Sequence, residues 1–345
     1  MLAPTAHTQN SIYYQTLNRM GWSMLIFIGL FNMATTVSTS ILAIQEFVTS
    51  PFWNAVLTAL YGALASLCYV APFFLTGLLY FAMSRRIRTE RLSLDVRIPR
   101  EFPLWIFAGL AVLTAAAYIN SQFCTAIGYI VPTEMLTSGV YDNPTIVIQY
   151  MTVAIAPAFA EEFLFRGVFY TNLRPFGKTQ AILISSLLFA LMHQNIGQIF
   201  YTFVAGIAMA LMYEMTGSIW CSVFFHLFNN ELSVLTEVLY YGRYGEAAQP
   251  YLSIQDAVLF LLGMVSIVLL VLYYKKKAPT QDSARICGIF GAHESVGRRC
   301  EQPVDAKAVV KGALSPGMVV FTAVTIVLMG LTWMLLALLD GGALG

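Results

Sequence analysis

Nine long apolar segments separated by polar stretches dominate this 345-residue sequence. They cover about residues 20–45, 54–83, 104–130, 146–170, 179–195, 197–214, 218–240, 253–274 and 317–339. A membrane-spanning helix needs roughly 20 apolar residues, so most of these segments are long enough to cross a bilayer. Strand patterns are absent, and backbone polar groups in lipid must be satisfied within their own segment. The sequence therefore predicts an all-α polytopic membrane protein, a bundle of about 8–9 transmembrane helices. Eight spans result if two of the short segments form a re-entrant pair.

The composition supports a location in lipid. Hydrophobic residues make up 58% of the chain and charged residues only 11%, whereas soluble domains carry about 25% charged residues. The mean hydropathy is +0.70. A net charge of +1 gives no reason to expect an acidic partner. We therefore expect the lipid bilayer as the surroundings of this chain and no nucleic-acid partner.

Basic residues gather in alternate loops, which predicts the orientation in the membrane. The segment 85–100 contains six arginines, and the segment 275–316 contains eight lysines and arginines. Arg174 and Lys178 lie between the fourth and fifth apolar segments, and the opposite loops carry only Arg243. Lysine and arginine are enriched in cytoplasmic loops. We therefore expect a multi-pass protein of the plasma membrane with a cytoplasmic N-terminus.

Three charged residues lie inside the fourth apolar segment, in the stretch "EEFLFR" at 161–166. A charge at the bilayer centre costs from roughly 2.5 to over 10 kcal/mol, so such side chains face the bundle interior and pair with one another. Glu162 and Arg166 are four residues apart and share one helix face, which predicts an ion pair. Glu161 points about 100° away and is free for another partner.

Pro157 stands four residues before Glu161 and predicts a kink in the same helix. Proline has no N–H, so it cannot bond the carbonyl of Val153. In a membrane helix, such a freed carbonyl needs a neighbour or water. A kink beside the glutamate suits a polar cavity at the centre of the bundle, open to the cytoplasm.

Two histidines and an asparagine lie in later apolar segments. His193 follows Phe189 by four residues, so the ring of Phe189 should pack beneath it. His226 and Asn230 are also four apart and share one helix face. Helix geometry places Glu161, His226 and His193 at about 13, 12 and 21 Å along their helices. Three helices can therefore bring one carboxylate and two imidazoles to a similar depth.

These groups suit the hydrolysis of an amide bond. A buried glutamate paired with a histidine can remove a proton from water for attack on a carbonyl carbon. A second histidine and an asparagine amide can donate hydrogen bonds to the oxyanion that develops. The pattern therefore predicts peptide-bond hydrolysis inside a membrane.

At these positions the sequence resembles the CAAX proteases and bacteriocin-processing enzymes, also called the Abi or CPBP intramembrane proteases. The family motifs EExxxR, FxxxH and HxxxN correspond in order to "EEFLFR", "FALMH" (189–193) and "HLFNN" (226–230). The resemblance covers roughly residues 145–232. It implies that Glu161 and His193 activate water, that His226 and Asn230 form the oxyanion site, and that Glu162 and Arg166 orient Glu161 or the substrate.

The resemblance also divides the chain and suggests its substrates. It implies a catalytic core in 145–240, and the apolar segments on either side predict N-terminal transmembrane helices in 1–144 and C-terminal transmembrane helices in 241–345. The basic residues of the loop 275–316 predict that this loop is cytoplasmic. The expected partner is a membrane-associated peptide or protein, and the sequence leaves open whether that substrate is prenylated.

Metal dependence has two possible answers at this stage. Glu161, His193 and His226 are a chemically suitable set of three zinc ligands. The HExxH motif of many zinc proteases is absent. We therefore expect no cofactor and a glutamate-dependent hydrolysis, with a zinc protease as the alternative.

Two functions from other classes fit part of the pattern. Intramembrane glutamate, histidine and arginine also form ion relays in transporters, although a second Glu/Arg motif in another half of the chain is lacking. A protease-like scaffold that binds peptides without cleaving them, as an immunity or regulatory protein would, also needs a polar cavity. The pair of Glu162 and Arg166 could also be purely structural.

Overall fold

The computed structural model describes residues 6–45, 47–84, 96, 98–129, 143–277 and 304–342, and within these ranges every regular element is a helix. The first three are α1 (Ala6–Gln45), α2 (Pro51–Met83) and α3 (Phe102–Ala126). A composite helix follows, made of α5 (Asn143–Gln149), η1 (Tyr150–Ile155), α6 (Ala156–Glu162), η2 (Phe163–Tyr170), α7 (Thr171–Leu173) and η3 (Arg174–Phe176). The rest are α8 (Lys178–Met192), α9 (Ile199–Thr216), α10 (Ile219–Glu237), η4 (Val238–Tyr244), η5 (Gly245–Ala248), α11 (Gln249–Lys277), α13 (Ala306–Ala313) and α14 (Pro316–Gly342).

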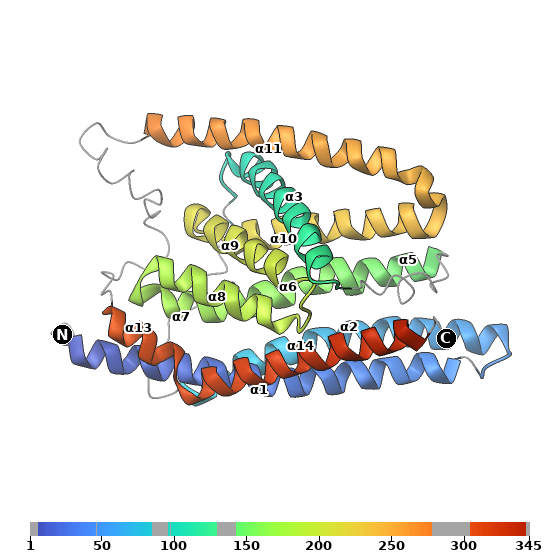
Figure 1. Ribbon diagram of the computed structural model, residues 1–345, viewed down its shortest axis with the longest axis horizontal. Helices are drawn as coiled ribbons and strands as arrows, with labels where there is room; N and C mark the ends of the chain where they lie inside the picture. Colours follow the sequence, from blue (N-terminus) through green and yellow to red (C-terminus); the bar gives the residue numbers. More distant parts are fainter. Residues whose placement is uncertain are drawn as a thin grey trace.

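The predicted class, an all-α polytopic membrane protein, is confirmed in the described part of the chain. Seven helical segments there are long and apolar enough to cross a membrane. One of them, Ile219–Lys276, contains both α10 and α11, between which the chain turns back on itself (Figure 1). The helix Lys178–Met192 is apolar but shorter. This count differs from the predicted 8–9 spans because α10 and α11 form one segment and α8 has only 15 residues.

The helices form three neighbouring groups (Figure 1). The long helices α1, α2 and α14 lie together on one side, and α3 with α11 lies on the other. Between them are α6, α8, α9 and α10, where α8 contacts α9, α9 contacts α10, and α10 contacts α6. The composite helix that contains Glu161 is therefore enclosed by the bundle rather than placed at its edge.

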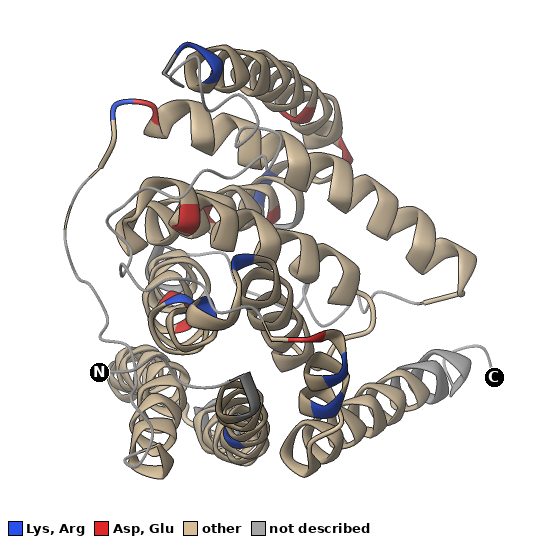
Figure 2. Ribbon diagram, turned by 90° about the vertical axis from the view of Figure 1, so that its left-hand side faces the viewer, with Lys and Arg blue, Asp and Glu red and all other residues tan. Residues whose placement is uncertain are grey.

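The outer faces are apolar, as expected of helices in contact with lipid. Figure 2 shows acidic and basic residues at few positions, with most of the helical surface uncharged. Along α11, exposed side chains include Leu261, Val265 and Leu272, at 64%, 56% and 57% exposure. Water gives no favourable environment to such a surface, whereas hydrocarbon does.

Several predicted features lie outside the described residues. These are five of the six arginines of the segment 85–100 and most of the loop 275–316, with Cys287 and Cys300. The division of the chain at 144 and 240 and the orientation in the membrane stay predictions.

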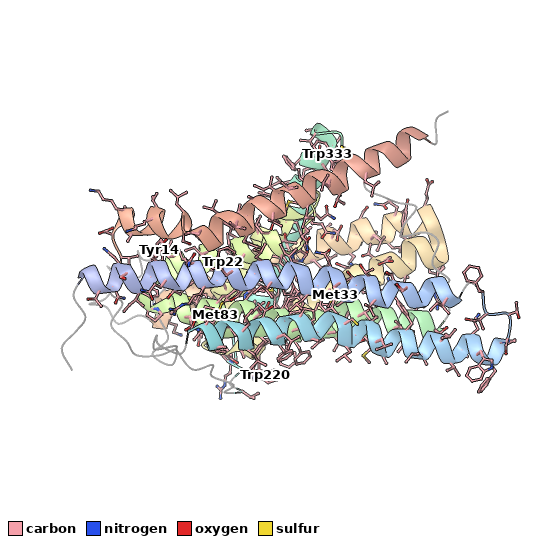
Figure 3. All side chains as sticks on the ribbon, turned by 90° about the horizontal axis from the view of Figure 1, so that it is seen from below. Tyr14, Trp22, Met33, Met83, Trp220 and Trp333 are labelled. Carbon is pink, nitrogen blue, oxygen red and sulfur yellow. The ribbon has the colours of Figure 1, made fainter. Side chains whose placement is uncertain are left out.

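Helices α1 and α14 approach each other closely at two glycines. A Cβ atom on Gly21 would lie 2.1 Å from the backbone carbon of Gly317. At the same crossing, the side chain of Asn18 accepts a 2.7 Å hydrogen bond from the backbone N–H of Gly317. Beyond this point α14 diverges from α1 toward Trp333 (Figure 3). Small residues at a crossing let two membrane helices come into backbone contact.

We expect Gly21→Ala to destabilise the protein, because the added methyl group forces α1 and α14 apart. Inserting a methyl group into a packed interface costs about 1–3 kcal/mol. Gly29→Ala is the matched control, since it lies on the same helix and its added Cβ would meet nothing within 4 Å. Thermal unfolding of the purified protein in detergent measures both variants. Equal melting temperatures for the two would show that the crossing is not tight.

Candidate active site

A buried ion pair lies at the centre of the candidate site. A guanidinium nitrogen of Arg166 lies 2.8 Å from Oε1 of Glu162, and both side chains are fully buried. The other terminal nitrogen of Arg166 donates a 2.8 Å hydrogen bond to the carbonyl of Gly206 on α9. The guanidinium also lies over the ring of Phe189 on α8, 4.9 Å from its centroid. The predicted pair is therefore present, and it connects the composite helix to α8 and α9.

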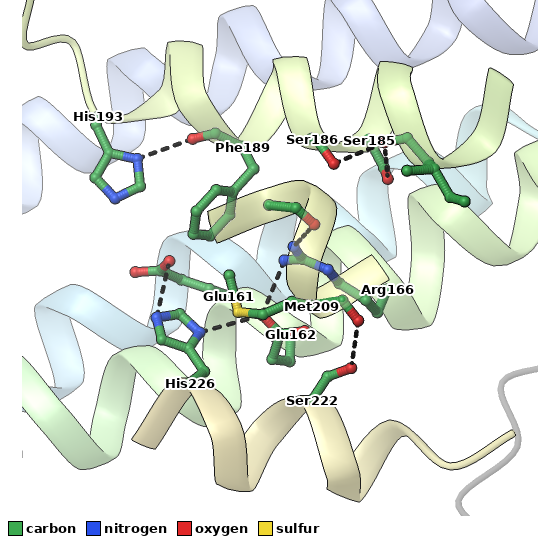
Figure 4. A network of polar contacts seen from close by, with 12 residues as sticks. Glu161, Glu162, Arg166, Ser185, Ser186, Phe189, His193, Met209, Ser222 and His226 are labelled. Carbon is green, nitrogen blue, oxygen red and sulfur yellow. Dashed lines mark hydrogen bonds and ion pairs between the residues drawn. The ribbon is translucent and has the colours of Figure 1, made fainter. Parts of the chain in front are cut away.

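His226 on α10 lies between the two glutamates (Figure 4). Its Nδ1 atom is 3.1 Å from Oε1 of Glu162, and its Nε2 atom is 3.9 Å from Oε2 of Glu161. The histidine is 5% exposed. Oxygen Oε1 of Glu162 therefore receives contacts from both Arg166 and His226, an arrangement that the spacing of the motifs did not predict.

His193 lies at the C-terminal end of α8, where the helix gives way to a turn. Its Nδ1 atom is 2.8 Å from the carbonyl oxygen of Phe189. The next residue, Gln194, has a positive φ of 51°, a conformation that ends the helix. The ring of Phe189 packs against His193 at 4.9 Å and against His226 at 5.9 Å between centroids. Phe189 therefore packs against His193 as predicted, and it also contacts the second imidazole.

Asn230 contacts the backbone that Pro157 leaves unbonded. Its side-chain nitrogen donates a 3.1 Å hydrogen bond to the carbonyl of Val153, the acceptor that proline cannot use four residues later. Its side-chain oxygen accepts a 3.3 Å hydrogen bond from the side-chain nitrogen of Asn229. Asn230 thus forms no hydrogen bond with the other predicted site residues in the described structure.

A cavity of about 710 Å³ joins the predicted catalytic side chains. Glu161, His193, His226 and Asn230 all lie on its wall. Glu162 and Arg166 do not line the cavity, and both are fully buried in the bundle. Uncharged polar side chains line much of the rest, among them Asn120, Gln198, Tyr201, Thr202 and Asn229.

The motifs gave no indication of one contact to Glu161. The hydroxyl of Tyr69 on α2 donates a hydrogen bond to Oε1 of Glu161. Tyr69 lies 92 residues before the glutamate, within an apolar segment that contains other aromatic residues. A single tyrosine in such a segment carries no spacing signal, so only the three-dimensional arrangement identifies it.

The site was also tested for its fit to a metal ion. Within the described ranges, no group of three His, Cys, Asp or Glu side chains is arranged to hold one. The zinc alternative needs Glu161, His193 and His226 to converge. His193 and His226 direct their Nδ1 atoms to Phe189 and Glu162, which leaves the Nε2 atom of each ring for another contact. We derive no chemical step through a metal.

Fold and cavity together define a polytopic helical membrane protein with a glutamate–histidine site enclosed by its bundle. Residues 143–232 match the family model described as type II CAAX prenyl endopeptidase Rce1-like, so this segment is similar to that family. The matched segment has 90 residues (143 through 232) in a chain of 345, and it contains all six predicted site residues. The predicted resemblance over roughly 145–232 is confirmed. No curated protein and no solved structure matches the chain.

We expect Arg166→Ala to destabilise the protein strongly, because Glu162 would stay buried without its main counter-charge. Breaking a buried pair by removing one partner costs about 3–5 kcal/mol. Arg100→Ala, which removes an exposed arginine, is the control and should leave the melting temperature unchanged. If Arg166→Ala melts at the temperature of the unsubstituted protein, the pair does not stabilise the bundle.

Proposed function

We propose that this chain is an intramembrane endopeptidase that hydrolyses a peptide bond of a membrane-associated protein or peptide. One observation carries the proposal: Glu161, His193, His226 and Asn230 come from three separate helical elements and line one cavity. The match of residues 143–232 to a type II CAAX prenyl endopeptidase model supports proteolysis rather than transport or simple binding.

Glu161 and His193 activate the attacking water in this proposal. Oxygen Oε2 of Glu161 is buried and accepts no hydrogen bond from the described protein groups, so it is available to accept a proton from water. A carbonyl oxygen only accepts hydrogen bonds, so the Nδ1 atom of His193 must donate to Phe189. The neutral ring then has its lone pair on Nε2, where it can orient the same water.

His226 and Asn230 stabilise the oxyanion. The Nδ1 atom of His226 faces a carboxylate oxygen of Glu162, which only accepts when ionised, so Nδ1 carries a proton. Its Nε2 atom donates when the ring is doubly protonated. Two positive charges (Arg166 and His226) then balance two negative charges (Glu161 and Glu162). Asn230 donates one side-chain N–H to the carbonyl of Val153, and its second N–H can donate to the substrate oxygen.

The function is tested by comparing membrane peptides from cells that express the chain or its Glu161→Gln variant. New peptide C-termini that appear only with the unsubstituted chain identify cleaved bonds, and mass spectrometry also shows whether those substrates are prenylated. A quenched-fluorescence peptide that spans such a bond is then the probe for the purified protein in phospholipid vesicles. Identical peptide sets in the two samples would contradict proteolysis and favour the transporter or binding alternatives.

Glu161→Gln should abolish hydrolysis of the probe while folding and peptide binding persist. The amide keeps the shape and the hydrogen bonding of the side chain but cannot accept the proton from water. His193→Ala should act in the same direction. Glu246→Gln, which changes an exposed carboxylate, is the control. Turnover that survives in Glu161→Gln would rule out its role as the base.

The same assay tests the two proposed oxyanion donors and the dependence of hydrolysis on a metal. His226→Ala and Asn230→Ala should each lower kcat by about 100-fold, since one oxyanion donor contributes roughly 3 kcal/mol. A chelator should leave hydrolysis unchanged if no metal is involved. Loss of activity with a chelator and recovery with zinc would make Glu161 a metal ligand instead.

We also propose that the chain lies in the plasma membrane with its N-terminus in the cytoplasm, on the basis of the lysine and arginine distribution. Cys287 and Cys300, which lie outside the described residues, should then react with a membrane-impermeant thiol reagent only after the membrane is opened. The variant with both cysteines changed to serine corrects for the other thiols. Labelling of these two positions in intact cells would reverse the orientation.

A further inference from the structure

Tyr69 lies outside the segment that matches the protease family, yet it contacts the proposed general base. It is on α2, lines the same cavity as Glu161, and donates its hydroxyl to Oε1 of that glutamate. We infer that Tyr69 is a positioning residue for the proposed peptide hydrolysis, because it fixes the Glu161 carboxylate with Oε2 toward His226 and the cavity. The inference rests on the proposed function and adds a residue from another part of the chain.

The hydrogen-bond partners of the two glutamates explain why Glu161 needs such a residue. Arg166 and His226 both make their short contacts to Glu162. Nε2 of His226 is 3.9 Å from Glu161, beyond hydrogen-bond distance. Among the described residues, Tyr69 is the one hydrogen-bond donor to Glu161. A carboxylate at the end of a flexible side chain would otherwise be free to rotate.

The tyrosine ring is itself held in place by aromatic neighbours. It packs edge-on against Phe31 of α1 and tilted against Phe73 of α2, with 5.4 Å between centroids in each pair. The ring direction is therefore determined by packing, and the hydroxyl is directed at the glutamate. Pre-oriented groups of this kind lower the reorganisation needed during a reaction.

The two oxygens of Glu161 acquire separate tasks in this arrangement. Oε1 accepts the tyrosine O–H, a hydrogen bond to a charged group and hence a strong one. Oε2 is left as the oxygen that receives the proton from water. Tyr69 keeps its own proton throughout, so it acts on the reaction only through Glu161.

Tyr69→Phe tests the inference, because it removes the hydroxyl and keeps the ring against Phe31 and Phe73. With the quenched-fluorescence peptide as substrate, kcat should fall about 10- to 100-fold, the effect of one hydrogen bond to a charged group. KM should stay at the value of the unsubstituted protein. Turnover is measured well below the melting temperature of the variant, because a buried carboxylate that loses its donor also lowers stability. Tyr61→Phe is the matched control, since Tyr61 lies on the same helix and does not line the cavity.

A second measurement does not depend on turnover. The infrared carboxylate band that disappears in Glu161→Gln should shift in Tyr69→Phe and stay unchanged in Tyr61→Phe. An unchanged kcat or an unshifted band in Tyr69→Phe would overturn the inference. So would a change confined to KM, which would place Tyr69 against the substrate. If the unsubstituted protein cleaves no peptide while the band still shifts, the proposed function fails and the contact to Glu161 stands.

Discussion

The buried pair of Glu162 and Arg166 is the constraint on which the centre of the bundle depends. Neither side chain has any exposure, and each charge would be very costly in a low-dielectric interior without a partner. The ion pair does not use every hydrogen-bonding group of the two side chains. Arg166 also donates to the carbonyl of Gly206, and Glu162 also contacts the imidazole of His226. Helices α9 and α10 must therefore pack against the composite helix, which encloses the cavity beside Glu161.

Features that follow from local spacing were predictable from the sequence. The nine apolar segments all correspond to helices, because length and hydropathy determine whether a segment can cross lipid. The pair of Glu162 and Arg166 follows from four-residue spacing on one helix. Contacts between helices were not predictable in the same way. His226 could reach Glu161 or Glu162 depending on a rotation of α10, and Tyr69 is one of 18 tyrosines with no motif to distinguish it.

Asn230 combines a structural contact beside Pro157 with the oxyanion role that we propose for it. The proline removes a backbone donor, and the amide of Asn230 bonds the carbonyl that is left. This contact ties α10 to the composite helix about two turns before Glu161. An asparagine can do this because its amide has two N–H groups, whereas a serine at the same position would have one donor to share. The two π-helical stretches that flank α6 are of a kind frequent at functional sites.

The distribution of charge around the cavity bears on how a peptide would be held there in the proposed hydrolysis. Charged groups are concentrated at one wall, with Glu161 on the surface and the pair of Glu162 and Arg166 behind it. The other walls offer amide and hydroxyl groups such as Asn120, Gln198 and Tyr201. An extended peptide that leaves its own secondary structure needs replacement hydrogen bonds for its backbone in a membrane, and neutral amides and hydroxyls supply them without competing with the reacting carbonyl. In the proposed hydrolysis, the negative charge on that carbonyl oxygen would be stabilised by hydrogen bonds from His226 and Asn230, which both line the cavity.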